Sequence, residues 1–295
     1  MKIYYGITNN LKDVTEICMN KLTHNNIINI PAGDHTRSSF FNDHLVGTVK
    51  KIIVENNDIM TEYNHDTQVK IDITNNNIEI INNDDINNKT KEIHSKLKIN
   101  YGTFNDELPE QKMVVRYLSG NEKVLEIGAN IGRNSLMIAS ILNNPQNLVS
   151  LESDINIARQ LNQNKVLNNL DFYIENSALS NRKLIQKGWD TIPSDTLING
   201  YNSVNTITLD NLKNKYNIEF DTLVLDCEGA FYYILMDMPE ILTNINLIIM
   251  ENDYWDITHK IYIDNVLLQN NFYRDYVELG GWGPCYNNFF EVWKK

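Results

Sequence analysis

The fold of this 295-residue chain is decided by one stretch, Val124-Leu125-Glu126-Ile127-Gly128-Ala129-Asn130-Ile131-Gly132-Arg133-Asn134-Ser135. An apolar run typical of a buried strand carries an acid near its end, a Gly-x-x-x-Gly turn follows, and an amphipathic helix is predicted from residue 134. Glycines at a strand's carboxyl end let a ligand approach bare backbone. The stretch therefore predicts a strand–turn–helix unit that binds a nucleotide.

Two features of this stretch argue against a dinucleotide. Only Gly128 and Gly132 are present, so the third glycine of the dinucleotide fingerprint is missing. Glu126 would repel a pyrophosphate, whereas it suits a cationic amino group, directly or through a water molecule. A glycine turn needed only for packing is the alternative interpretation.

Strands and helices alternate on both sides of this stretch beyond Tyr101. Strands are predicted over 123–127, 148–152, 172–175, 222–226 and 247–251, and helices over 134–142, 155–167, 230–238 and about 258–269. Such alternation implies a parallel sheet with helices on both faces. Two closing strands, 273–278 and 288–293, have no helix between them and should form an antiparallel hairpin at one edge.

The first part of the chain has a different pattern. Runs at 48–54 and 68–73 have strand character, and residues 75–90 are dominated by Asn and Asp, which predicts a surface strand or a linker. We therefore expect a small β-rich accessory domain with its Asn-rich linker over residues 1–90, and a second domain over 91–295. The first domain could hold a substrate, mediate a homodimer, or do both.

Composition restricts the partners. Lys and Arg number 26 against 38 Asp and Glu, a formal net charge of −12. This charge disfavours nucleic acid and anionic membranes, which both attract basic faces. Apolar runs are too short for a membrane helix, and the first residues lack a signal-peptide core. Three cysteines have neither zinc-ligand nor disulfide-framework spacing, so we expect a cytoplasmic protein.

Polar residues follow the other predicted strands. Glu152 ends the strand after the glycine turn, where a carboxylate can accept both ribose hydroxyls of an adenosine. Asp154 is better placed to cap the next helix. The strand after that ends in Glu175-Asn176-Ser177-Ala178, which offers amide and hydroxyl groups and a small residue where an adenine could lie.

A pair of acids marks the strand predicted over 222–226. Asp226 and Glu228 stand two residues apart, so their side chains share one face while the strand lasts, and Gly229 permits a tight exit. Like charges held together raise one another's pKa and are costly without a function. We interpret this pair as functional.

Together these motifs resemble the FkbM-type family of S-adenosylmethionine-dependent O-methyltransferases. The resemblance covers about residues 101 to 293 and includes Thr208-Leu209-Asp210 and Leu225-Asp226-Cys227-Glu228-Gly229-Ala230. It implies an α/β, Rossmann-like, seven-stranded methyltransferase sheet with a C-terminal antiparallel hairpin. Val224 and Phe231 depart from the family, which usually has Lys and often has Glu at these two places.

The resemblance also implies a cofactor site. Glu126, Gly128 and Asn130 would lie near the methionine part of S-adenosylmethionine, Glu152 on the ribose, and Asp226 at the methyl-transfer site. The full set of expected cofactor contacts is Glu126, Gly128, Asn130, Gly132, Asn134, Glu152, Ser153, Asn176, Ser177, Ala178 and Asp226.

Many members of that family act on sugar hydroxyls, and Ile30–Arg37 with Gly47–Lys50 resembles leaders of glycan-associated members. We therefore expect a hydroxyl of a sugar or glycan precursor as the acceptor. A hydroxyl needs a general base. The candidate catalytic residues are Asp226, Glu228, Glu251 and His259, and the candidate acceptor contacts are Asp253, Trp255 and Trp282.

Three alternatives stay open at this point. The clustered carboxylates would also suit a divalent metal, although we favour hydrogen bonds to a sugar and assign no metal ligand. A nicotinamide-dependent dehydrogenase or epimerase could use the same glycine turn, but a Tyr-x-x-x-Lys pair is not recognisable. Because Val224 and Phe231 depart from the family, an inactive binding or scaffold protein on the same fold is the third.

Overall fold

The computed structural model describes residues 1–295, which divide into two compact units. The first consists of Met1–Asn88 with Asp275–Glu278, and the second of Lys89–Arg274 with Leu279–Lys295. Neither contains a helix that could span a membrane.

The first unit is β-rich. One antiparallel sheet has the order β2-β1-β5-β6 and the other β3-β4-β7-β8. Their bounds are β1 Lys2–Ile7, β2 Asn10–Asp13, β3 Thr23–His24, β4 Ile27–Ile30, β5 Lys51–Asn56, β6 Ile59–Tyr63, β7 Thr67–Asp72 and β8 Asn77–Asn82. Two short helices, α1 Thr15–Lys21 and α2 Asp34–Phe41, accompany them. Alternate strand residues such as Ile3, Ile28, Ile52 and Val69 are buried together in one core.

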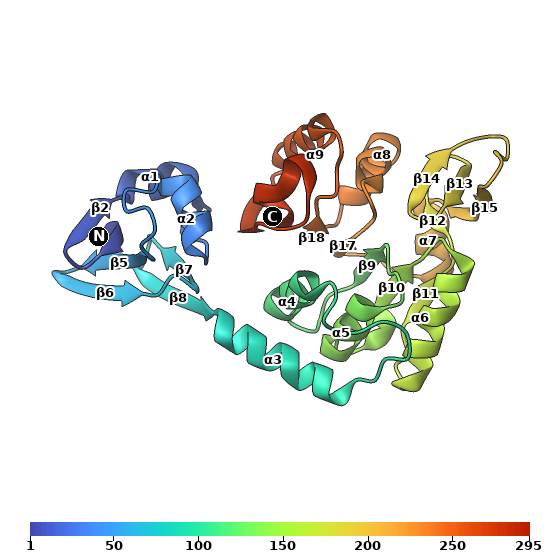
Figure 1. The fold of residues 1–295 in the computed structure, drawn as a ribbon, viewed down its shortest axis with the longest axis horizontal. Coiled ribbons are helices and arrows are strands. Elements are labelled where there is room, and N and C mark those ends of the chain that lie inside the picture. The colour runs from blue at the N-terminus through green and yellow to red at the C-terminus, as the bar shows by residue number, and fades with distance from the viewer. The chain divides into compact units, whose positions relative to one another are not determined.

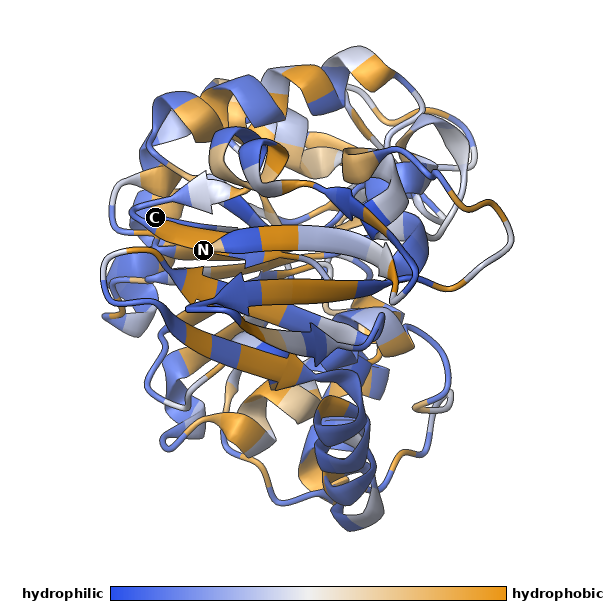
Figure 2. Ribbon diagram, turned by 90° about the vertical axis from the view of Figure 1, so that its left-hand side faces the viewer, coloured by the Kyte–Doolittle hydropathy of each residue, from blue (hydrophilic) through white to orange (hydrophobic).

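The Asn-rich segment is part strand and part helix. After β8 the chain enters helix α3, Asn83–Lys96, which is hydrophilic along most of its length (Figure 2). Asp84 and Asp85 lie in its first turn and Lys96 in its last, which suits the helix dipole. The expected surface strand is present, but a helix takes the place of the expected linker.

A seven-stranded mixed sheet, of which every strand except β19 lies wholly in the second unit, has the order β11-β10-β9-β17-β18-β20-β19. The strands are β9 Val124–Ile127, β10 Leu148–Leu151, β11 Tyr173–Glu175, β17 Thr222–Leu225, β18 Leu247–Glu251, β19 Tyr273–Glu278 and β20 Phe290–Lys294. The first five run parallel, and β20 pairs antiparallel with β18. The chain thus starts in the middle of the sheet at β9, builds one side, and returns to build the other. Ligands bind where strand order reverses, at the carboxyl ends of the strands.

Helices cover both faces of this sheet. Figure 1 shows α4 Leu108–Tyr117, α5 Arg133–Ile141 and α6 Ile155–Leu167 on one side, and α8 Ala230–Asp237 and α9 Ile257–Gln269 on the other. Short 3₁₀ turns occupy Pro145–Asn147, Pro239–Leu242 and Gly283–Asn288. The last of them delays β20 by two residues relative to the predicted start.

An insertion separates β11 from α7, Leu209–Tyr216. β12 Ala178–Leu179 pairs with β16 Thr206–Ile207, and between them β13 Leu184–Lys187, β14 Asp190–Pro193 and β15 Asn202–Val204 form a three-stranded sheet of their own. We call residues 184–204 the flap. Sequence periodicity predicts no strand in this insertion, because each of its strands has only two to four residues.

Candidate active site

A cavity of about 390 Å³ opens at the carboxyl ends of β9, β10, β17 and β18. Its volume lies within the range of small-molecule sites. Carboxylates line one part of it, and apolar side chains from the strand ends, β12, α8 and the flap line another: Ile127, Leu151, Leu179, Trp189, Pro193 and Ile234 among them.

The glycine turn brings main-chain groups to this edge. Gly128 has a φ of +88°, and a Cβ there would lie 1.6 Å from the main-chain oxygen of Asp226. Only glycine therefore allows β9 and β17 to end side by side. Gly132, with a φ of +93°, begins α5 in the left-handed region, and a Cβ there would meet Leu161.

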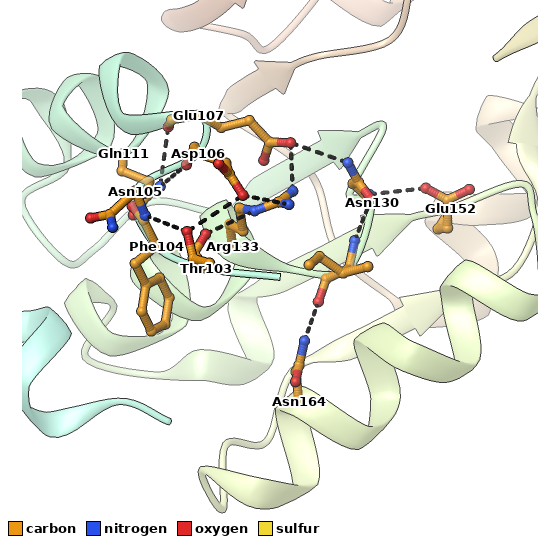
Figure 3. Close-up of polar contacts among 11 residues, drawn as sticks. Thr103, Phe104, Asn105, Asp106, Glu107, Gln111, Asn130, Arg133, Glu152 and Asn164 are labelled. Carbon is orange, nitrogen blue, oxygen red and sulfur yellow. Dashed lines mark hydrogen bonds and ion pairs between the residues drawn. The ribbon is translucent and has the colours of Figure 1, made fainter. Parts of the chain in front are cut away.

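Glu152 is held rigidly at the end of β10. Its Oε2 accepts the main-chain N–H of Asn130 at 2.9 Å, and its Oε1 accepts that of Asp154 at 2.8 Å (Figure 3 shows the first). Burial raises its pKa in spite of these bonds. Each carboxylate oxygen has a second lone-pair site, so Glu152 can still accept from ligand hydroxyls.

Glu107 is a cavity residue that the sequence analysis missed. It precedes α4 in the left-handed region with a φ of +54°. Its Oε1 accepts from Arg133 Nη1 at 2.6 Å and from Asn130 Nδ2 at 3.1 Å, as Figure 3 shows. Burial raises the pKa of Glu107 even though Arg133 opposes the shift. Pro109 could have indicated a helix start just after Glu107, because proline is common in the first turn of a helix.

The ends of β17 and β18 form an acidic wall. Asp226, Glu228 and Glu251 line the cavity. Burial, followed by repulsion from Glu107 and Glu110, raises the pKa of Asp226. Burial and a hydrogen bond to Asp253 raise the pKa of Glu228 to about 8. None of these three carboxylates forms an ion pair with a lysine or an arginine of the chain.

Glu126 is a buried residue of β9. Its side chain is 2% exposed and does not line the cavity. Its Oε2 accepts from the hydroxyls of Ser135 and Ser150, each at 2.5 Å. Burial raises its pKa to about 7. Glu126 thus links β9 to β10 and α5, and its expected contact with a cationic ligand, directly or through a water molecule, stays a prediction.

The other expected cofactor residues divide into two groups. Those that line the cavity are Gly128, Asn130, Glu152, Ser153, Ser177, Ala178 and Asp226. Gly132, Asn134 and Asn176 do not line it. Asn176 donates from Nδ2 to the main-chain oxygens of Glu152 and Ser153, so it orients their strand end. Asn134 is buried in the first turn of α5.

Four expected catalytic or acceptor residues lie outside the lining. His259 stacks on Tyr232 with ring centroids 3.8 Å apart. Trp255 and Trp282 form a pair with centroids at 4.1 Å, and Trp255 is 85% exposed. Asp253 contacts Glu228, and its Oδ1 has no hydrogen-bond partner. We did not foresee the pairing of the two tryptophans.

Arg182 is the only cationic side chain in the lining, and it is already engaged. Its Nε and Nη2 donate to the two carboxylate oxygens of Asp237, both at 2.6 Å. A two-pronged bond of this kind fixes the guanidinium. The cavity as a whole thus favours a cationic or neutral ligand over a polyanion.

No family model and no curated protein matches the chain, so the resemblance to the FkbM-type family stays a prediction. Several solved structures are similar. The ribosomal protein L11 methylase of Lactobacillus delbrueckii subsp. bulgaricus is 12% identical with a TM-score of 0.42, over 65% of this chain and 79% of that one.

Two further solved structures were determined with a cofactor or its product. The O-methyltransferase of Bacillus cereus, in complex with SAH, is 15% identical with a TM-score of 0.40, over 72% of this chain and 90% of that one. Fibrillarin of Aeropyrum pernix, with bound S-adenosyl-L-methionine, is 9% identical with a TM-score of 0.39, over 83% and 99%.

Proposed function

We propose that this chain is an S-adenosylmethionine-dependent O-methyltransferase. The observation that carries the proposal is the cavity at the strand ends, where Asp226 and Glu251, which form no ion pair with lysine or arginine, line the same space as Glu152. A ligand that is both a nucleoside and a cation matches these groups. S-adenosylmethionine is such a ligand, with ribose hydroxyls, an ammonium group and a positively charged sulfur.

The residues present fit this cofactor. Glu152 would accept the ribose hydroxyls with its remaining lone pairs, and Glu107 and Asp226 would face the cationic part. Leu151, Ala178 and the flap would enclose the adenine. When bound, the cofactor supplies a methyl group on a cationic sulfur, and the protein's main contribution is alignment of the acceptor with that group.

The acceptor would be a hydroxyl. Glu228, with a pKa raised to about 8, can take up a proton near neutral pH, and a positioned base of this kind contributes about 10²–10⁴-fold to a rate. Trp255 and Trp282 form an exposed pair. The pair supports a sugar or glycan precursor as acceptor, since sugar rings stack on aromatic faces.

The nicotinamide alternative is weaker on the same ground. A pyrophosphate needs donors and positive charge, and Arg182 is bound to Asp237. The alternative of an inactive scaffold is opposed by the acids of the cavity, because keeping mutually repelling carboxylates together is costly in a protein that does not use them.

Calorimetric titration of the full chain with S-adenosylhomocysteine (SAH), the demethylated product of the cofactor, and with NADH tests the proposal. We expect SAH to bind and NADH not to bind. Glu152→Gln should weaken SAH binding at least tenfold, about 1.4 kcal/mol, because an amide cannot accept hydrogen bonds on both of its heavy atoms. Glu175→Gln is the matched control: Glu175 ends the neighbouring strand β11, is equally buried, and is held by Lys215 outside the cavity.

The outcomes separate the three alternatives. NADH binding without SAH binding would favour the dehydrogenase. Absence of both would favour the scaffold. If SAH binds, incubation with labelled S-adenosylmethionine and a panel of sugars and nucleotide sugars should show methyl transfer to oxygen, and transfer only to nitrogen or carbon acceptors would contradict the O-methyltransferase assignment.

A further inference from the structure

Three carboxylates from three elements converge at the inner end of the acidic wall. Glu110 comes from α4, Asp226 follows β17, and Glu251 ends β18. One carboxylate oxygen of each lies within 4.8 Å of those of the other two. Oxygen ligands around a divalent cation are separated by similar distances, since each lies about 2.0–2.6 Å from the ion.

Glu110 supplies an independent observation. Its side chain is 5% exposed, yet its Oε2 has no hydrogen-bond partner. It reaches into the space shared with Asp226 and Glu251, and no lysine or arginine pairs with it. A buried carboxylate oxygen without a donor is costly, because it has lost water and gained nothing in return.

We propose that Glu110, Asp226 and Glu251 bind one divalent cation of the oxygen-preferring class, such as Mg²⁺, Mn²⁺ or Ca²⁺. All three ligands are carboxylates, which these hard cations prefer over imidazole or thiolate. Three carboxylates around one ion also remove the mutual repulsion that the protein alone leaves unbalanced.

The position of this site gives it a role, and this part rests on the proposed function. Asp226 and Glu251 line the cavity, whereas Glu110 does not. A cation held there would present an open face to the cavity, where the acceptor hydroxyl has to lie. It would bind that oxygen, orient it and lower its pKa, so the acceptor class extends to compounds with adjacent oxygens that can chelate an ion.

Sharing of protons is the competing account of the same geometry. Burial and a proton shared between Glu110 and Glu251 raise the pKa of Glu251 to about 11, so without an ion this group would hold its proton. The two accounts differ in one measurable property, because only the first predicts saturable binding of a metal.

Titration of the metal-free full chain with Mn²⁺, followed by electron paramagnetic resonance of the free ion, is the direct test. We expect one Mn²⁺ per chain with a dissociation constant at or below roughly 10⁻³ M, displaced by Mg²⁺ or Ca²⁺. Glu110→Gln, Asp226→Asn and Glu251→Gln should each weaken binding at least tenfold. Glu240→Gln, at an exposed glutamate of the same unit, should leave it unchanged.

These variants remove repelling charges at nearly constant volume, so we expect folded proteins, with circular dichroism and melting temperature as the check. Absence of saturable Mn²⁺ binding by the wild type overturns the inference. Retention of wild-type affinity by Glu110→Gln also overturns it, because Glu110 carries the argument. SAH titration of the same samples separates the proposals: SAH binding without Mn²⁺ binding defeats only the metal site, and the reverse defeats only the proposed cofactor.

Discussion

Two buried glutamates show how surroundings decide the role of one residue type. Glu126 on β9 is 2% exposed and meets only two hydroxyls. Glu291 on β20 is 0% exposed, but Lys260 and Arg274 lie 2.8 Å from its two oxygens. Burial raises the pKa of Glu126 to about 7, whereas at Glu291 the two cations outweigh burial and lower the pKa.

The raised pKa of Glu126 predicts a pH-dependent loss of stability. From about pH 4.5, its ordinary value, to about 7, the folded state binds this proton more tightly than the unfolded chain does. The free energy of unfolding therefore falls as pH rises through this window, by up to about 1.4 kcal/mol per pH unit for this group.

Glu126→Gln should remove this effect while its amide oxygen still accepts from both serines. We expect the variant to exceed the wild type in the free energy of unfolding by about 1 to 3 kcal/mol at pH 8, and the difference to vanish near pH 4.5. Urea denaturation at several pH values measures this. Glu291→Gln is the control with the opposite sign. It leaves the buried Lys260 without its charged partner, so the free energy of unfolding should fall by about 3–5 kcal/mol at pH 8. A Glu126→Gln protein less stable than wild type at pH 8 would contradict the assignment.

At the scale of elements, the central strands and several helices could be predicted from sequence. α6, β18 and β19 have the bounds that apolar periodicity indicated, and β9, β10 and β17 differ by one residue at an end. Continuous apolar runs of four or five residues are typical of strands in a sheet that helices cover on both faces. Once the strands were located, the glycines and acids that follow them in the sequence could be recognised as well.

The remaining part of the site could not be found because α4 was not recognised. Its first turn carries Glu110, with Glu107 just before it, and these acids complete the site from outside the strand–helix repeat. The position of the Glu126 side chain also could not be predicted, because the side-chain alternation of a strand does not say which face meets the ligand. Tertiary packing decided both cases.

The flap gives a prediction about motion. Leu184, Gln186, Trp189 and Ile192 line the cavity from a sheet of three short strands, which has few buried residues of its own. We expect SAH to slow amide hydrogen exchange over residues 184–193, because the ligand would supply the apolar contact that this sheet lacks. Exchange over β6, another strand with mostly exposed residues, is the internal reference and should not change. Equal exchange in the flap with and without saturating SAH would show that it does not enclose the ligand.

At the scale of the whole molecule, the net charge of −12 acquires a partial explanation. Six acidic side chains and one arginine line the cavity, so part of the excess is concentrated at one edge of one sheet. Those of the six carboxyl groups that are ionised attract cations and raise their local concentration. The overall charge, which at first only disfavoured polyanions, thus agrees with a cationic cofactor and with a divalent ion at the same edge.

Division into two units gives the last prediction. Every residue that lines the cavity lies between Glu107 and Glu251, in the second unit. Ile71 on β7 and Ile248 on β18 are both 0% exposed, one in each core. Ile71→Ala and Ile248→Ala should each cost about 2–5 kcal/mol, visible as earlier thermal loss of far-ultraviolet circular dichroism.

SAH affinity should separate these two substitutions at a temperature where both proteins are folded. Ile71→Ala should keep the wild-type dissociation constant within about twofold, because the void it leaves lies in the core of the first unit, which contributes no residue to the cavity lining. Ile248→Ala should weaken SAH binding, since a void under β18 lets Glu251 and its neighbours shift, and small displacements at such a site are costly. A tenfold loss of SAH affinity in Ile71→Ala would mean that the first unit contributes to the cofactor site, and the assignment of that site to the second unit alone would have to be abandoned.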